Sequence, residues 1–212
     1  MTNRLKQNFI KLSGDEKANV ITHATGWLLT FVFSPLLILS ASNAIQTLAF
    51  VVFCTGLLWM FSCSVIYHYV TGTHAKGFWQ LMDHISIFIL IAVSYTAFIM
   101  LYFNTPFGRN FLLVHWLIAL AGIGFKLFFG TRFEWISLSF YLVLGWMVTL
   151  VFHQITATMP VTVIYLIIAG GLSYTVGVLF FIFDRKYFFH AVWHVFVIGG
   201  CASHFAALAL SG

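Results

Sequence analysis

Seven apolar stretches, each about 20 residues long, occupy almost the whole chain. About 20 apolar residues in a helix cross the hydrocarbon core of a bilayer, and lipid offers no hydrogen bonds to an irregular backbone. The sequence therefore predicts an all-α fold: an integral membrane bundle of seven transmembrane helices. The expected spans are about residues 20–41, 46–68, 83–103, 110–129, 135–152, 161–183 and 190–210.

Composition supports the same class. The chain is 61% hydrophobic and only 7% charged, whereas soluble domains carry roughly 25% charged residues. No linker or charge block divides it, so we expect a short cytoplasmic N-terminal segment, residues 1–19, and one transmembrane domain, residues 20–212. A net charge of +5, thinly spread, argues against nucleic acid as a partner. The cysteines lack disulfide or CxxC spacing and are expected to be buried apolar residues: Cys54, Cys63 and Cys201.

The distribution of Lys and Arg predicts the orientation. Nine of these ten residues fall in the N-terminal segment and alternate loops, and the other side receives Arg109 alone. Positive residues collect on the cytoplasmic side, so we expect a cytoplasmic N-terminus, an external C-terminus and a multi-pass location in the plasma (inner) membrane. A signal peptide cleaved near residues 41–44 is the alternative for the first span. Asp15 and Glu16 argue against it.

Four potential metal ligands are expected at one membrane depth. His68 closes the second span, Asp83 opens the third, and His190 and His194 open the seventh. With the N-terminus inside, all of these helix ends lie on the cytoplasmic side. Because ionisable groups at membrane depth are costly, four in one place favour a function over chance.

The spacing of these residues suits zinc. His190 and His194 are four residues apart and share a helix face, and Ser64 and His68 repeat that spacing. Three His ligands plus water make the open coordination that catalytic zinc sites use. Asp83 is then a fourth ligand, or a general base that orients the water. Spacing alone also leaves open a proton relay and a simple His–Asp hydrogen-bond network.

Four motifs occur in order along the chain: Glu16-x-x-Asn19-x-x-Thr22-His23, Ser64-x-x-x-His68, Asp83-His84, and His190-x-x-Trp193-His194-x-Phe196-Val197 with His204-Phe205. With this set, the sequence resembles the hemolysin III family. That family is the bacterial branch of the progestin and adiponectin receptor family and belongs to a superfamily that contains alkaline ceramidases. The resemblance covers about residues 14–210. It departs at residues 93–97, where Gly and Pro are expected around Tyr-Thr.

The resemblance implies a specific site. It implies seven helices with a cytoplasmic N-terminus, zinc held by His68, His190 and His194, and Asp83 and Ser64 beside a bound water. It also implies a lipid-facing cavity, with membrane lipids or fatty acids as partners. Some members are proposed to hydrolyse lipid amides, some are named for haemolysis, and the bacterial branch is linked to membrane-lipid homeostasis.

We therefore expect a zinc-dependent hydrolase of lipid amides or esters, with Asp83 as proton acceptor and Ser64 orienting the water. The first alternative is a non-catalytic sensor of membrane lipid state, in which zinc is structural. The second is a pore-forming haemolysin, which is less favoured because almost no charge lines the spans.

Other polar residues are expected to have structural roles. Glu16, Asn19 and His23 lie at the cytoplasmic edge of the first span, where they would cap helix ends or contact loops beside the site. His204 lies about 15 Å deeper than His194 at 1.5 Å per residue, too far to share its metal, and is expected to form a hydrogen bond in the core. The remaining histidines fall in loops or near helix ends and indicate no function: His74, His115 and His153.

Overall fold

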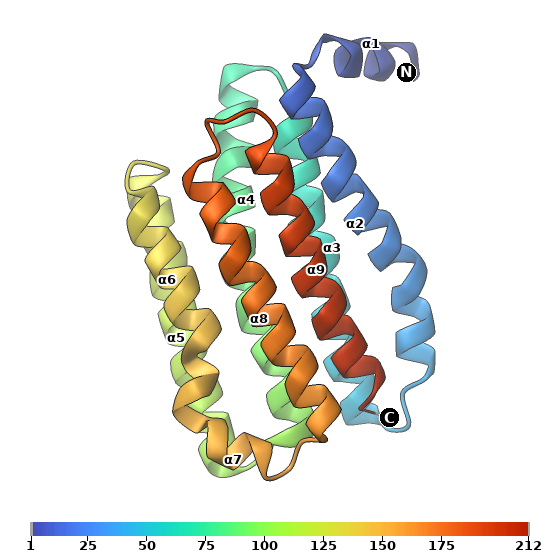
Figure 1. The fold of residues 1–212 in the computed structure, drawn as a ribbon, viewed down its shortest axis with the longest axis vertical. Coiled ribbons are helices and arrows are strands. Elements are labelled where there is room, and N and C mark those ends of the chain that lie inside the picture. The colour runs from blue at the N-terminus through green and yellow to red at the C-terminus, as the bar shows by residue number, and fades with distance from the viewer. Residues whose placement is uncertain (1, 212) are drawn as a thin grey trace.

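The structure, a computed structural model, describes residues 2–211, with side chains from residue 7 onward. Throughout this part of the chain the regular structure is helical, and its longer helices run along one axis (Figure 1). The elements are α1 (Thr2–Lys11), α2 (Gly14–Leu39), α3 (Ala44–Tyr69), α4 (Thr73–Tyr102), α5 (Pro106–Phe129), α6 (Glu134–Trp146), the 3₁₀ helix η1 (Met147–Val151), α7 (Phe152–Thr156), α8 (Val161–Ile182) and α9 (Phe189–Ala209).

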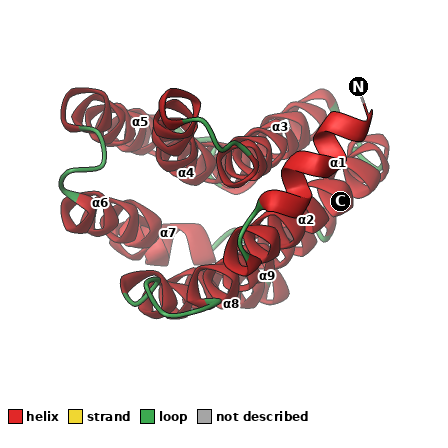
Figure 2. Ribbon diagram, turned by 90° about the horizontal axis from the view of Figure 1, so that it is seen from above, coloured by secondary structure: helices red, strands yellow, loops and turns green. Residues whose placement is uncertain are grey.

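Seven segments are long and apolar enough to cross a membrane, which confirms the predicted all-α membrane bundle. They are α2, α3, α4, α5, residues 134–156, α8 and α9. Figure 2 shows them as a ring in the order α2, α3, α4, α5, α6, α8 and α9, which closes where α9 packs on α2. In the most apolar window of α3 and of α4, 56% of the residues are buried, against 22% for α5 and α8. The core is therefore centred on α3 and α4.

Two helices begin earlier than their hydropathy suggests. Ser13 caps α2 by accepting a hydrogen bond from the Glu16 amide at 3.2 Å, so this helix begins at Gly14 rather than near residue 20. Helix α4 begins at Thr73, which places Asp83 about three turns inside the helix. The expectation that Asp83 opens the third span is therefore wrong. The polar first turns of both helices hid their true beginnings.

The fifth span changes its helical type near the end. Helix α6 stops at Trp146, and the chain continues as η1 and α7. The Tyr95 hydroxyl accepts a hydrogen bond from the Val148 amide at 2.7 Å and donates one to the Gly145 carbonyl at 2.9 Å. It therefore satisfies backbone groups that a break exposes in an apolar setting. Helix α4 itself is continuous through residues 93–97, where the sequence departs from the family pattern.

The alternation of the helices gives the bundle two ends. Helices α2, α4, α6 and α9 begin at one end, which we call the N-terminal end, and α3, α5 and α8 finish there (Figure 1). The opposite end, where α9 terminates at Ala209, we call the C-terminal end. The three cysteines are buried, as expected, and their thiols form no disulfide bond.

Candidate metal centre

Three histidines converge at the N-terminal end of the bundle. His68 lies in the last turn of α3, and His190 and His194 lie in the first two turns of α9. One ring nitrogen of each lies within 4.8 Å of the others. The ring centroids are 4.7 Å apart for His190 and His194, 5.0 Å for His68 and His190, and 5.1 Å for His68 and His194. This group could hold a metal ion.

Each of these histidines has its Nδ1 atom near a different side-chain oxygen. Such partners fix the orientation of a metal-binding imidazole and leave Nε2 for the ion. His68 Nε2 is indeed buried and has no hydrogen-bond partner, so the residues present fit a metal ion. The three contacts are Glu16 Oε2 to His68 Nδ1 at 2.6 Å, Thr22 Oγ1 to His194 Nδ1 at 3.0 Å, and Asp184 Oδ2 to His190 Nδ1 at 3.6 Å.

Helix α2 supplies a second layer around the histidines. Besides the His68 contact, Glu16 accepts a hydrogen bond from Lys76 Nζ at 2.6 Å. Asn19 Nδ2 lies 3.3 Å from His68 Nδ1, and the His23 ring stacks on His194 with centroids 3.5 Å apart. From the sequence, these α2 residues were expected to cap helices or contact loops beside the site, and their direct contacts with the histidines were not predicted. The signal was present, because positions 16, 19 and 23 share one helix face.

Asp83 and Ser64 lie beside the cluster. Both side chains are buried, and both line the same cavity as His190 and His194. Ser64 Oγ lies near the Asp83 carboxylate but has no hydrogen-bond partner of good geometry. Asp83 forms no ion pair with any described residue. The structure therefore brings all five predicted site residues to one end of the bundle.

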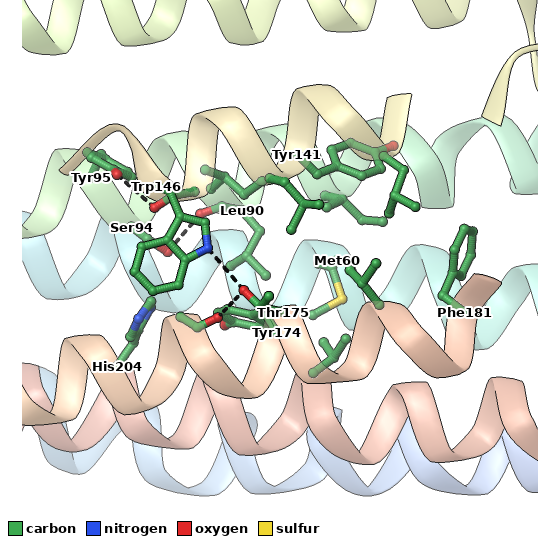
Figure 3. Close-up of a pocket in the computed structure, with 18 of the residues that line it drawn as sticks. Met60, Leu90, Ser94, Tyr95, Tyr141, Trp146, Tyr174, Thr175, Phe181 and His204 are labelled. Carbon is green, nitrogen blue, oxygen red and sulfur yellow. Dashed lines mark hydrogen bonds between the residues drawn. The ribbon is translucent and has the colours of Figure 1, made fainter. Parts of the chain in front are cut away.

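The cavity runs from the histidine cluster into the middle of the bundle. It has a volume of about 180 Å³, and its walls are mainly apolar. In Figure 3, Tyr141 and Trp146 from α6 face Met60 from α3 and Thr175 from α8. His204 lies at the end of the cavity away from Phe181, and its Nε2 atom is 3.4 Å from the Ile167 carbonyl oxygen. This contact confirms the predicted hydrogen bond in the core.

Two other polar groups are more deeply buried than the sequence suggested. Lys126, counted there as a cytoplasmic charge, has a fully buried side chain, and its Nζ atom lies 3.0 Å from His84 Nδ1. His115 lies in the middle of α5, fully buried and stacked on Tyr95, so its placement near a helix end is wrong. His153 is exposed and lies in the short helix α7, near a helix end as expected. Hydropathy windows average over all faces of a helix, and so they did not indicate which polar side chain faces the core.

Comparison with known proteins identifies the family. The family model described as "Haemolysin-III related" matches residues 13–205. The chain belongs to this family. It is 36% identical over 194 residues to "Hemolysin-3 homolog" of Bacillus subtilis (strain 168), a match that covers 90% of this chain and 91% of the relative. It is 33% identical over 194 residues to "Hemolysin-3" of Bacillus cereus, covering 90% of this chain and 89% of that protein.

A more distant relative is found in animals. The chain is 28% identical over 200 residues to "Monocyte to macrophage differentiation factor" of Homo sapiens, covering 92% of this chain and 83% of the relative. No solved structure matches the chain. Together, the seven apolar helices and the family identify this haemolysin III-related chain as a multi-pass membrane protein.

Proposed function

We propose that this haemolysin III-related protein is a zinc-dependent hydrolase of lipid amides or esters. The observation that carries the proposal is the set of three histidines whose Nδ1 atoms each lie near a separate oxygen. A hydrogen-bond network alone would not require His68 Nε2 to be buried without a partner. Metal binding explains that atom, because it uses the nitrogen that hydrogen bonds leave free.

The surrounding residues can be given roles in hydrolysis. His68, His190 and His194 would hold the zinc ion through their Nε2 atoms. When bound, zinc activates water and polarises a carbonyl group. The Asp83 carboxylate, which lines the cavity, would accept a proton from a water molecule, and Ser64 Oγ, which lacks a hydrogen-bond partner, would orient that water by a hydrogen bond. The apolar cavity would hold the acyl chain and exclude bulk water.

A lipid sensor is the second candidate, and the same cavity favours it. An apolar cavity that ends at a metal site could bind an acyl chain and report its presence without chemistry. In that case Asp83 would help to hold the site together and would transfer no proton. Replacing this carboxylate by an amide of the same size separates the two functions.

The test compares the wild type with Asp83→Asn after reconstitution in lipid. Ceramide-like and phospholipid substrates are supplied, and released fatty acid is measured with and without zinc. The amide can form a hydrogen bond but cannot accept the proton, so we expect turnover to fall about 10²–10⁴-fold while zinc is retained. If zinc is bound but no lipid class is hydrolysed, the sensor function replaces the enzyme.

We also propose that the bundle lies in the plasma (inner) membrane of a bacterium, with its N-terminal end facing the cytoplasm. The nine-to-one distribution of Lys and Arg supports this orientation, and two relatives come from Bacillus. Reporter enzymes that are active on only one side of the membrane, fused to each terminus, test it. The C-terminal fusion should be active outside, and activity only in the cytoplasm would reverse the proposed side of the metal centre.

A further inference from the structure

Lys126 is a buried cation whose charge has no close counterion. Its side chain is 0% exposed in the last turn of α5. Lysine is almost never fully buried unless it is paired with an acid. Among residues 7–211, however, no carboxylate lies within ion-pair distance of Lys126. None of the ion pairs of the described residues therefore neutralises this charge.

The hydrogen-bond partner of Lys126 is itself a base. Lys126 Nζ donates to His84 Nδ1 at 3.0 Å, and the Tyr141 hydroxyl donates to the His84 backbone carbonyl at 2.8 Å. A neutral imidazole accepts one N–H group and leaves the positive charge uncancelled. His84 therefore positions the ammonium group, which retains two further N–H donors for another acceptor.

Both side chains line the cavity that contains the proposed active site. They come from α4 and α5, whereas two of the three clustered histidines come from α9, across the ring in Figure 2. The cavity thus has, besides the histidines of the cluster, a second basic side chain in its wall. The rest of the wall is mainly apolar, so a ligand that matches both features is an acyl chain with a negative head.

Glu134 is an acidic residue that attracts the charge of Lys126 electrostatically from beyond contact distance. It also lines the cavity, but its side chain is exposed, and it forms no ion pair with Lys126. A solvated carboxylate beyond contact distance compensates a buried charge only weakly. An anion in direct contact with the ammonium group would compensate the charge much better.

We propose that Lys126, positioned by His84, binds the oxyanion head of a single-chain lipid, a carboxylate or a phosphate, whose chain lies along the cavity. The ammonium group supplies charged hydrogen bonds, and the apolar wall selects the chain. This inference rests on the proposed lipid hydrolase and narrows its ligands. They are anionic single-chain lipids, bound as substrate or as a released fatty acid.

Binding of defined probes, measured in detergent without turnover, tests the proposal. Oleate is the anionic probe, and oleyl alcohol is its neutral counterpart. Loss of a hydrogen bond to a charged group weakens oleate binding by about 10- to 100-fold in Lys126→Met, while oleyl alcohol binds as before. Lys126→Arg, which keeps the charge, is expected to restore oleate binding to within a few-fold of the wild type.

Competition distinguishes a lipid head from free phosphate. Lysophosphatidate should displace oleate, whereas inorganic phosphate, which has no chain, should not at the same concentration. If lysophosphatidate and inorganic phosphate displaced oleate equally well, the bound anion would not have to belong to a lipid, and the proposal would be wrong. Glu134→Gln should leave oleate binding unchanged or tighten it, because it removes a carboxylate that competes for Lys126. Weaker oleate binding in that variant would contradict the proposal.

A purely structural role for Lys126 predicts a different result. It would make oleate and oleyl alcohol bind equally less well to Lys126→Met, together with a lower melting temperature. We expect the melting temperature to be unchanged or higher, because replacing an unpaired buried charge with an apolar side chain of similar volume is often stabilising. If the two probes are discriminated while the ceramide-like and phospholipid substrates of the hydrolysis assay release no fatty acid, the enzyme is rejected and this binding site still stands.

Discussion

The two ends of the bundle use polar side chains differently. At the C-terminal end the polar contacts are mostly local. Asn43 Oδ1 accepts a hydrogen bond from the Gln46 amide at 3.0 Å, and Thr105 Oγ1 accepts one from the Gly108 amide at 3.0 Å, each three residues away. Arg109 donates to Asn104 Oδ1, five residues away, at 3.1 Å. These side chains cap helices and occupy backbone groups that a helix end leaves free.

At the N-terminal end the polar contacts join distant parts of the chain. Glu16 and His68 are 52 positions apart, His84 and Lys126 are 42 apart, and Thr22 and His194 are 172 apart. Most of these side chains are buried, where polar groups are costly unless they are paired. Polar side chains at the C-terminal end therefore mainly cap helices, whereas those at the N-terminal end surround the candidate metal centre.

The largest expected effect is on zinc content, which should depend on a histidine at the N-terminal end but not on one at the C-terminal end. His190→Ala should reduce bound zinc from about one ion per chain to nearly none, because three ligands become two. His153→Ala is the control, since His153 is exposed in α7 at the C-terminal end. Metal content is measured by mass spectrometry on protein purified in detergent. Equal zinc in both variants would remove the distinction between the two ends.

A smaller effect is expected at the second layer. Glu16→Gln weakens the partner of His68 Nδ1 and should lower zinc affinity about 10- to 100-fold, as loss of an outer partner typically does. Asp15→Asn is the matched control, because Asp15 accepts a hydrogen bond from the Phe188 amide and contacts none of the three histidines. Competition with a chelator measures both affinities. If the two variants bind zinc alike, the contact between Glu16 and His68 is only structural.

The smallest effect belongs to the caps. Asn43→Ala should lower the free energy of unfolding by about 1 kcal/mol and leave zinc affinity unchanged. Ser13→Ala, which removes the cap of α2 at the other end, should cost about the same. A thermal melt followed by circular dichroism, together with zinc titration, checks both variants. A loss of zinc affinity in Asn43→Ala would show that the two ends are coupled.

Much of this arrangement was predictable from local pattern. Runs of apolar residues gave the seven spans, and alternation of the spans placed His68, His190 and His194 at one end. The beginnings of α2 and α4 were missed, because their first turns are polar and continue beyond the apolar core. Lys126 was misjudged for a related reason. Its burial depends on which face of α5 meets α4, and a hydropathy window does not distinguish faces.

The sequence by itself determined the number of membrane-spanning segments, their order and the common end of the histidines, because apolarity and chain alternation are local properties. Tertiary structure alone decided which atoms meet. Contacts such as Glu16 with His68 and Lys126 with His84 depend on the rotation and depth of each helix. Packing against helices remote in sequence sets both. The same packing formed the cavity beside Asp83 and Ser64. Side chains from several helices line this cavity, so the sequence of one helix does not predict it.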